Sequence, residues 1–281
     1  MPPTAIMFPG QGSLTPGAAD AARASWPELV ARAGDLLGED PFERFAETTA
    51  SAQPAIFVAS MALWRELDRP LDDVVAMAGH SLGEISALTA AGALQLDDAL
   101  ELVVLRGRLM ADAGAANEGG TMLALLGGGP AQAEALAERH RVSIANDNAP
   151  GQVVLSGREW RLKACATEAR DMGFKTMALD VTGAFHSPSM RPAVLPLLRA
   201  LEAAAIAEPR VPVISCATAR AFSDVPGELS RAVVVPVRWR EVMAELVARG
   251  AEDFVDVGPG QVLARLVKRN AARREAGVVP A

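Results

Sequence analysis

The pentapeptide Gly79-His80-Ser81-Leu82-Gly83 constrains the fold of this chain more than any other segment. It places a serine between two glycines, each two residues away, which is the Gly-x-Ser-x-Gly pattern of a nucleophile elbow. Such an elbow is a tight turn from a strand into a helix, and the glycines are needed because a Cβ at either position would collide with neighbouring backbone. The turn lifts the serine hydroxyl away from the backbone and aims the first free N–H groups of the helix at a reacting carbonyl.

The segments on both sides of the elbow fit that context. Residues 73–78 form a short apolar run with adjacent valines, which predicts a buried strand. Residues 84–91 are rich in helix formers and stop at Gly92, which predicts a helix. The same pattern without these flanks is more often a plain Gly-Ser turn. With a strand before it and a helix after it, the pattern favours a nucleophilic serine.

A nucleophilic serine needs a base, and the chain contains three histidines. His80 adjoins the serine on an extended segment, so its side chain is expected to point away from the hydroxyl. His140 lies at the charged end of a predicted helix, where a cation suits the helix dipole and a solvated role is expected. His186 lies in a segment with few charges and with turn signals on both sides. By elimination His186 is the candidate base, and the alternative is a histidine packed in a loop.

Further segments accompany the elbow in a fixed order along nearly the whole chain. They are residues 5–13, 105–110, 145–157, 183–187, 236–239 and 257–260. Any one of these motifs would be weak, but together and in register they are specific. In this order and spacing the chain closely resembles the malonyl-CoA:acyl-carrier-protein transacylases and the acyltransferase domains of polyketide and fatty-acid synthases.

The resemblance implies a role for each matching residue. Ser81 would carry the acyl group as an ester, and His186 would be the general base and later the general acid. Gln11 and the amide of Leu82 would line the oxyanion hole. Arg106 would hold the free carboxylate of a malonyl group, and a guanidinium suits this role because its planar pair of donors matches a carboxylate. The alternative for Arg106 is a surface arginine that caps the last turn of a helix.

The same resemblance addresses specificity and the orientation of the histidine. Phe185, directly before His186, would fill the space that a branched methylmalonyl group needs. Since a pocket discriminates one methyl by only about 1–3 kcal/mol, a preference for malonyl is expected rather than exclusion of other groups. A backbone carbonyl from about Ala232 would orient the imidazole in place of an acidic residue. The family often has asparagine at the position of Val235, and this departure leaves the geometry of that loop open.

The order of predicted elements indicates an α/β protein with two lobes. Strands and helices alternate through residues 1–118 and again in 184–281, which predicts a large α/β-hydrolase-like lobe with a mostly parallel sheet. Residues 119–183 predict an inserted ferredoxin-like lobe with the order βαββαβ. Its predicted strands are 121–125, 142–146, 152–156 and 175–180, and its predicted helices are 131–139 and 160–171. The active site is expected in the cleft between the lobes.

The resemblance implies transfer of a malonyl group from malonyl-CoA to the phosphopantetheine thiol of an acyl carrier protein, by a ping-pong reaction through Ser81. The enzyme would serve fatty-acid synthesis, or a polyketide assembly line as a stand-alone, trans-acting acyltransferase. One alternative is an acyl-thioester hydrolase that proofreads on the same scaffold, which would leave Arg106 buried without a partner. Another is a non-catalytic scaffold that has kept the fold, which the joint presence of the site residues disfavours.

Composition restricts the setting of the enzyme. Half of the 281 residues are apolar, yet no run approaches the about 18–20 uncharged residues that a membrane span needs. The N-terminus has no basic segment typical of a secretory signal. Cys165 and Cys216 lack metal-ligand spacing, which predicts buried thiols in a reducing compartment. We therefore expect a cytoplasmic, monomeric enzyme with no metal or other cofactor and with no nucleic-acid or membrane partner.

Overall fold

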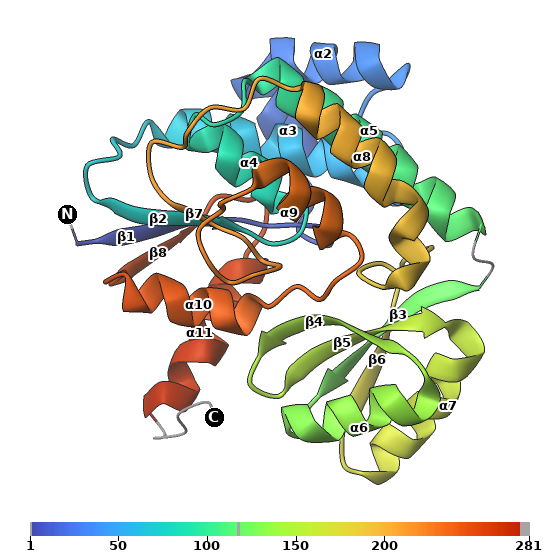
Figure 1. The fold of residues 1–281 in the computed structure, drawn as a ribbon. Helices are drawn as coiled ribbons and strands as arrows, with labels where there is room; N and C mark the ends of the chain where they lie inside the picture. The colour runs from blue at the N-terminus through green and yellow to red at the C-terminus, as the bar shows by residue number, and fades with distance from the viewer. Residues whose placement is uncertain (1, 117–118, 276–281) are drawn as a thin grey trace.

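The computed structural model describes residues 2–116 and 119–275, which form two lobes that are each built on one sheet (Figure 1). The sheet of the large lobe has the order β7-β2-β1-β8, and every neighbouring pair is parallel. Its strands are β1 (Thr4–Phe8), β2 (Val74–Gly79), β7 (Val213–Ile214) and β8 (Asp253–Asp256). The predicted parallel sheet is therefore confirmed.

Helices cover both faces of this sheet, as Figure 1 shows. Ile6 and Phe8 of β1 face the core under the larger helical layer, and Ala5 and Met7 face a second core under the last two helices. Because both faces are covered, β1 is a continuous apolar run rather than an alternating one. The larger layer comprises α1 (Ala18–Ser25), α2 (Pro27–Leu37), α3 (Thr49–Leu67), α4 (Gly83–Ala90), α5 (Leu96–Ala116), η1 (Pro188–Met190), α8 (Arg191–Ala203) and α9 (Val225–Ala232). The opposite layer comprises α10 (Trp239–Ala248) and α11 (Val262–Glu275).

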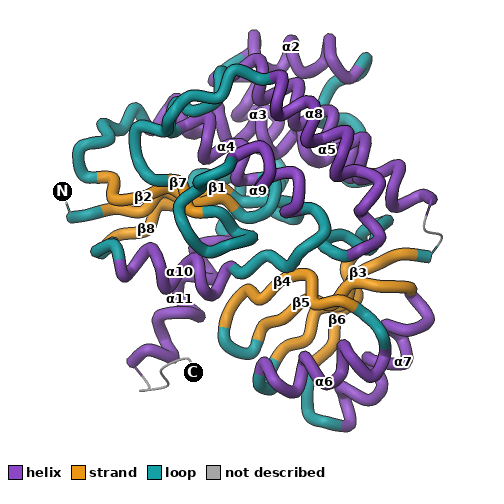
Figure 2. Tube along the Cα trace, in the orientation of Figure 1, coloured by secondary structure: helices purple, strands orange, loops and turns teal. Residues whose placement is uncertain are grey.

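The small lobe has an antiparallel sheet of order β4-β5-β3-β6, seen below and to the right in Figure 2. The chain order β3, α6, β4, β5, α7, β6 confirms the predicted ferredoxin-like pattern. Leu123 and Leu125 of β3 pack against its two helices, whereas Met122 and Ala124 face the large lobe. The elements are β3 (Gly120–Leu126), α6 (Pro130–His140), β4 (Ser143–Ala149), β5 (Gln152–Arg158), α7 (Glu159–Asp171) and β6 (Lys175–Leu179).

The predicted end of one strand was wrong. The sequence predicts a strand over 142–146, but β4 continues to Ala149 through Asn146, Asp147 and Asn148. Asparagine and aspartate are poor strand formers in isolation, and here pairing with β5 overrides that preference. The predicted lobe boundary after residue 118 lies outside the described residues, and the division at 183/184 stays a prediction. In the part of the chain that the structure describes, no helix is long and apolar enough to cross a membrane.

Candidate active site

The elbow is formed at the junction of β2 and α4. Ser81 has a φ of 55°, in the left-handed region that residues with a side chain rarely adopt. A Cβ added to Gly79 would lie 1.9 Å from the carbonyl carbon of Gly83, and one added to Gly83 would lie 2.0 Å from the backbone oxygen of Phe8. Both glycines are therefore required by close backbone contacts, which explains the pattern from which the elbow was predicted.

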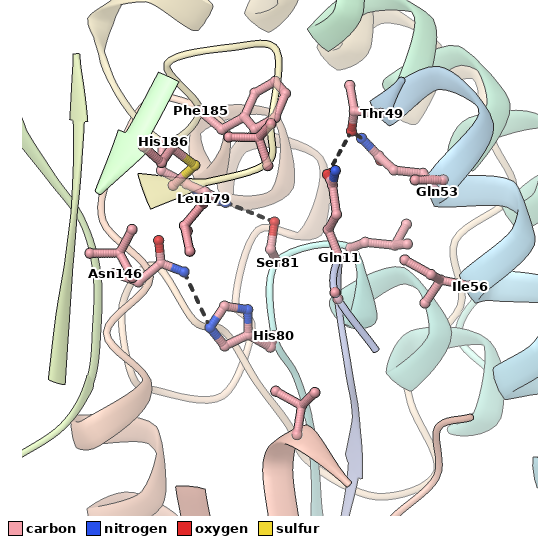
Figure 3. Close-up of a pocket in the computed structure, with 18 of the residues that line it drawn as sticks. Gln11, Thr49, Gln53, Ile56, His80, Ser81, Asn146, Leu179, Phe185 and His186 are labelled. Carbon is pink, nitrogen blue, oxygen red and sulfur yellow. Dashed lines mark hydrogen bonds between the residues drawn. The ribbon is translucent and has the colours of Figure 1, made fainter. Parts of the chain in front are cut away.

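His186 follows β6 in the chain, and its side chain points toward Ser81 (Figure 3). Its Nε2 lies 2.8 Å from Ser81 Oγ. Its Nδ1 lies 2.9 Å from the carbonyl oxygen of Ala232 and 3.2 Å from that of Val235. A carbonyl oxygen can only accept, so Nδ1 carries the proton and Nε2 presents its lone pair to the serine. The Ala232 carbonyl is free for this contact because it belongs to the last turn of α9.

Burial keeps the imidazole of His186 uncharged. The residue is 5% exposed, and burial lowers its pKa to about 3, with the positive charge of Arg106 as the second cause. The two backbone carbonyls act in the opposite direction but are outweighed. At neutral pH His186 is therefore an unprotonated base.

Arg106 is buried beside this pair and not on the surface. It is 4% exposed on α5, donating from Nη2 to Ser81 Oγ at 3.0 Å and from Nη1 to Gln53 Oε1 at 2.6 Å. Gln53 donates in turn to Thr49 at 2.9 Å, and the Thr49 hydroxyl donates to Gln11 Oε1 at 3.1 Å. No carboxylate among the described residues forms an ion pair with Arg106, and burial lowers its pKa. The alternative of a surface arginine is thus excluded.

These side chains share one cavity of about 460 Å³ between the lobes. Gln11 and Leu82 lie on its wall, and their backbone N–H groups have no hydrogen-bond partner within residues 2–116 and 119–275. Phe185, 5% exposed, also lines it. The small lobe contributes Met122, Asn146, Asn148, Gln152, Val154 and Leu179. The cavity therefore combines a serine, a base, free N–H donors and a buried cation, which suits acyl transfer of a group that carries a negative charge.

The side chains of the other two histidines do not bond to the nucleophile, although His80 lines the same cavity. The Nε2 of His80 is 2.8 Å from Asn148 Oδ1, and its ring centroid is 5.4 Å from that of Trp239. His140 pairs with Glu168 in the small lobe, with 2.8 Å between Nε2 and Oε2. Neither imidazole forms a hydrogen bond with the Ser81 hydroxyl in the described structure, so the elimination that selected His186 agrees with the geometry.

Two groups close to the elbow were missed in the sequence. Gln53, which holds Arg106, is an amide in an otherwise apolar stretch of α3, and this contrast was the available signal. Glu84 is 1% exposed; its Oε1 accepts from the Cys216 amide at 2.7 Å, and its Oε2 has no partner in the described structure. Burial raises the pKa of Glu84 to about 7. No group of three or more His, Cys, Asp or Glu within the described residues could hold a metal ion.

Comparison with known proteins gives consistent matches over the chain. Residues 21–280 match the family model described as acyl transferase domain. The malonyl CoA-acyl carrier protein transacylase of Bacillus subtilis (strain 168) is 37% identical over 287 residues, covering 94% of this chain and 89% of that protein. The crystal structure of FabD from Acinetobacter baumannii has a TM-score of 0.85 and 35% identity, covering 95% of this chain and 90% of that one.

A further solved structure contains a type II PKS acyl-carrier protein in complex with its malonyl-transacylase. It has a TM-score of 0.88 and 31% identity, covering 96% of this chain and 93% of that one. The family model spans most of the sequence, and a relative above 30% identity covers nearly all of it. The chain therefore belongs to the acyl transferase domain family and is an acyltransferase.

Proposed function

We propose that this enzyme transfers a malonyl group from malonyl-CoA to the phosphopantetheine thiol of an acyl carrier protein. The observation that carries the proposal is the buried guanidinium of Arg106 in the same cavity as Ser81 and His186. No carboxylate of the described residues lies within ion-pair distance of it, and Glu84 attracts it only from farther away. An acyl group that ends in a carboxylate fits this cavity, because its thioester carbonyl can meet Ser81 while its carboxylate pairs with Arg106. The names of the Bacillus subtilis relative and of the carrier complex support the same donor and acceptor.

In the first half-reaction Ser81 attacks the thioester carbonyl while His186 takes the hydroxyl proton. The N–H groups of Gln11 and Leu82 stabilise the oxyanion of the tetrahedral intermediate. The carbon–sulfur bond then breaks, the proton on His186 passes to the sulfur, and coenzyme A leaves. The malonyl group remains as an ester on Ser81.

In the second half-reaction the carrier thiol takes the place of coenzyme A. His186 removes the thiol proton, the new carbon–sulfur bond forms, and the ester bond to Ser81 breaks. The proton returns to the serine oxygen. Each step uses side chains and backbone groups of the chain, so the proposed mechanism draws on no metal or other cofactor.

The carboxylate of malonyl also increases the basicity of His186. The charge of Arg106 lowers the pKa of His186, and a bound carboxylate offsets that charge. The base is therefore strengthened when the proper substrate is in place. The dipole at the end of α9 acts in the same sense, because the Ala232 carbonyl stabilises an imidazolium.

We further propose a cytoplasmic, monomeric enzyme. Cys165 and Cys216 are both free and buried, which suits a reducing compartment. All groups used in the mechanism come from a single chain, so a second copy is not needed to complete the site.

The experiment follows the acyl group by intact mass and peptide mapping. The protein is incubated with malonyl-CoA, and Ser81→Ala serves as the control. We expect a malonyl adduct on Ser81 that disappears when holo carrier protein is added, with malonyl recovered on the carrier thiol.

Two other results would contradict the proposal. Rapid release of malonate to water, with none on the carrier, would favour the thioester hydrolase. The absence of an adduct with any acyl-CoA would favour a non-catalytic scaffold.

A further inference from the structure

The loop between α9 and α10 connects His186 to the small lobe. Figures 1 and 2 show residues 233–238 running beside β4, and the backbone contacts agree: the Asp147 amide donates to the Val237 carbonyl at 2.9 Å, and the Val237 amide donates to Ala145 at 2.8 Å. This single bridge covers part of the free edge of β4. The same loop and the end of α9 supply the two carbonyls that accept from His186 Nδ1.

One ion pair closes this contact between the lobes. Arg240, in the first turn of α10, donates from Nε and Nη2 to the Asp147 carboxylate at 2.9 and 2.7 Å. The side chains are 24% and 20% exposed, so the pair is more shielded than most ion pairs on this molecule. Side chains alternate along a strand, and accordingly Asn146 and Asn148 approach His80 while Asp147 faces α10.

We infer that Asp147 and Arg240 are positioning residues for acyl transfer, because their ion pair holds the α9–α10 loop on β4 and so keeps the carbonyls of Ala232 and Val235 aligned with His186. The inference rests on the proposed function, since it concerns His186 as the base. A two-point guanidinium–carboxylate contact fixes distance and angle together, which a single hydrogen bond does not. Arg238 ties the end of this loop to the large lobe, through its amide to the Cys216 carbonyl and its Nη1 to the Thr218 carbonyl. On the β4 side the backbone bridge is one pair of hydrogen bonds, and the ion pair adds a side-chain contact to it.

The chain offers a matched control at the same loop. Arg238 pairs with Glu241 at the start of α10; this pair is more exposed, at 40% and 41%, and both residues lie in the large lobe. Breaking that pair removes an ion pair of the same type and leaves the hydrogen bonds between Arg240 and Asp147 in place, although Glu241 also attracts Arg240 more weakly than Asp147 does. Asp147→Asn and Glu241→Gln therefore differ chiefly in whether the link between the lobes is broken.

The test measures the rate of malonyl-ester formation on Ser81 at saturating malonyl-CoA, by rapid quench and intact mass, across a range of pH. Asp147→Asn is expected to slow the reaction on the order of tenfold with little change in KM, because the base is misaligned while the substrate contacts remain. The acidic limb of its pH–rate profile is expected to move upward, because a looser loop admits water to His186 and weakens the burial that lowers its pKa. Weaker contacts with the two carbonyls act in the opposite direction, but burial is the larger cause. Arg106 and His80 are the charged or titratable groups that face His186, and both are unchanged in this variant.

Glu241→Gln is expected to match the unaltered enzyme in rate and profile. The double variant Asp147→Arg, Arg240→Asp, which reverses the pair, is expected to recover most of the rate. Equal rates and profiles for Asp147→Asn and Glu241→Gln would overturn this inference alone. A slower rate with an unshifted pH profile would also overturn it, by assigning the pair a structural role only. An unaltered enzyme that forms no ester would instead overturn the proposed function, and this inference with it.

Discussion

Arg106→Met provides the sharpest test of how the cavity selects its acyl group. Arg106 is 4% exposed, and its two hydrogen bonds go to the neutral groups of Ser81 and Gln53. In the proposed reaction one of its donor edges turns to the malonyl carboxylate. Methionine keeps much of the volume of arginine, so the variant removes the charge and the donors while the wall of the cavity stays filled.

The expected magnitude follows from the cost of an unpaired buried charge. Removing one partner of a buried ion pair costs about 3–5 kcal/mol. At about 1.36 kcal/mol for each factor of ten, kcat/KM for malonyl-CoA is expected to fall between about a hundredfold and a few thousandfold. Acetyl-CoA carries no carboxylate, and loss of the Arg106 charge removes one cause of the lowered His186 pKa. The acetyl reaction is therefore expected to change by less than about tenfold.

The assay compares malonyl-CoA and acetyl-CoA as donors to the same holo carrier protein, with the unaltered enzyme alongside. Thermal unfolding controls for the loss of the hydrogen bond to Gln53, which leaves its Oε1 without a donor. A fall in the ratio of kcat/KM for malonyl-CoA to that for acetyl-CoA, toward one, supports the reasoning. Equal losses for both donors in a variant that stays folded would show that Arg106 does not recognise the carboxylate.

Three further predictions concern stability and specificity. The folded-state pKa of Glu84 is raised to about 7 from 4.5, so ionised Glu84 has no destabilising effect below pH 4.5, and the effect develops as pH rises to 7. Glu84→Gln keeps the acceptor for the Cys216 amide, and its free energy of unfolding is expected to exceed that of the unaltered protein by an amount that grows to about 3 kcal/mol between pH 5 and 8. Denaturant unfolding measures this difference, and a difference that does not change with pH would contradict the prediction. Gly83→Ala places a Cβ 2.0 Å from the Phe8 oxygen, so it is expected to abolish soluble expression or to lower the melting temperature sharply. A native-like melting temperature would contradict the close contact between α4 and β1 at this position. Phe185→Leu is expected to raise the ratio of methylmalonyl to malonyl kcat/KM up to about tenfold, and a constant ratio would mean that Phe185 does not limit the pocket.

Local patterns were enough to predict the elbow and the overall architecture. Gly79 and Gly83 are required by contacts within a few residues or with the adjacent strand, so their spacing, together with the strand and helix patterns on either side, predicts the elbow. The alternation of strands and helices predicts a parallel sheet with an inserted lobe, because each pattern reflects which faces of an element are covered. The strand through Asp147 was predicted too short because its stability comes from partners elsewhere in the chain.

Contacts that join distant segments were not predictable from residue identity. Val235 illustrates this, because the sequence left the loop geometry open where the family often has asparagine. The Val235 carbonyl lies 3.2 Å from His186 Nδ1, and the side chain plays no part in that contact. Any residue supplies a carbonyl, so no sequence pattern identifies this one. Likewise Asp147 and Arg240 are 93 residues apart, and nothing in either local sequence indicates the other. The network through Gln53 depends on how α3 packs against α5, which periodicity does not specify.

Both reacting residues adopt a backbone conformation that their own side chains disfavour. Ser81 has a φ of 55° and His186 one of 54°. A left-handed conformation costs a residue with a Cβ about 1–2 kcal/mol, so only the surrounding packing holds the two turns in place. We therefore expect mild heating or denaturant to abolish turnover while the far-UV circular dichroism is still native, because the strained turns relax before the sheets unfold. A glycine at position 81 would adopt this positive φ at lower cost than serine does, so the hydroxyl of Ser81 comes at the expense of backbone stability.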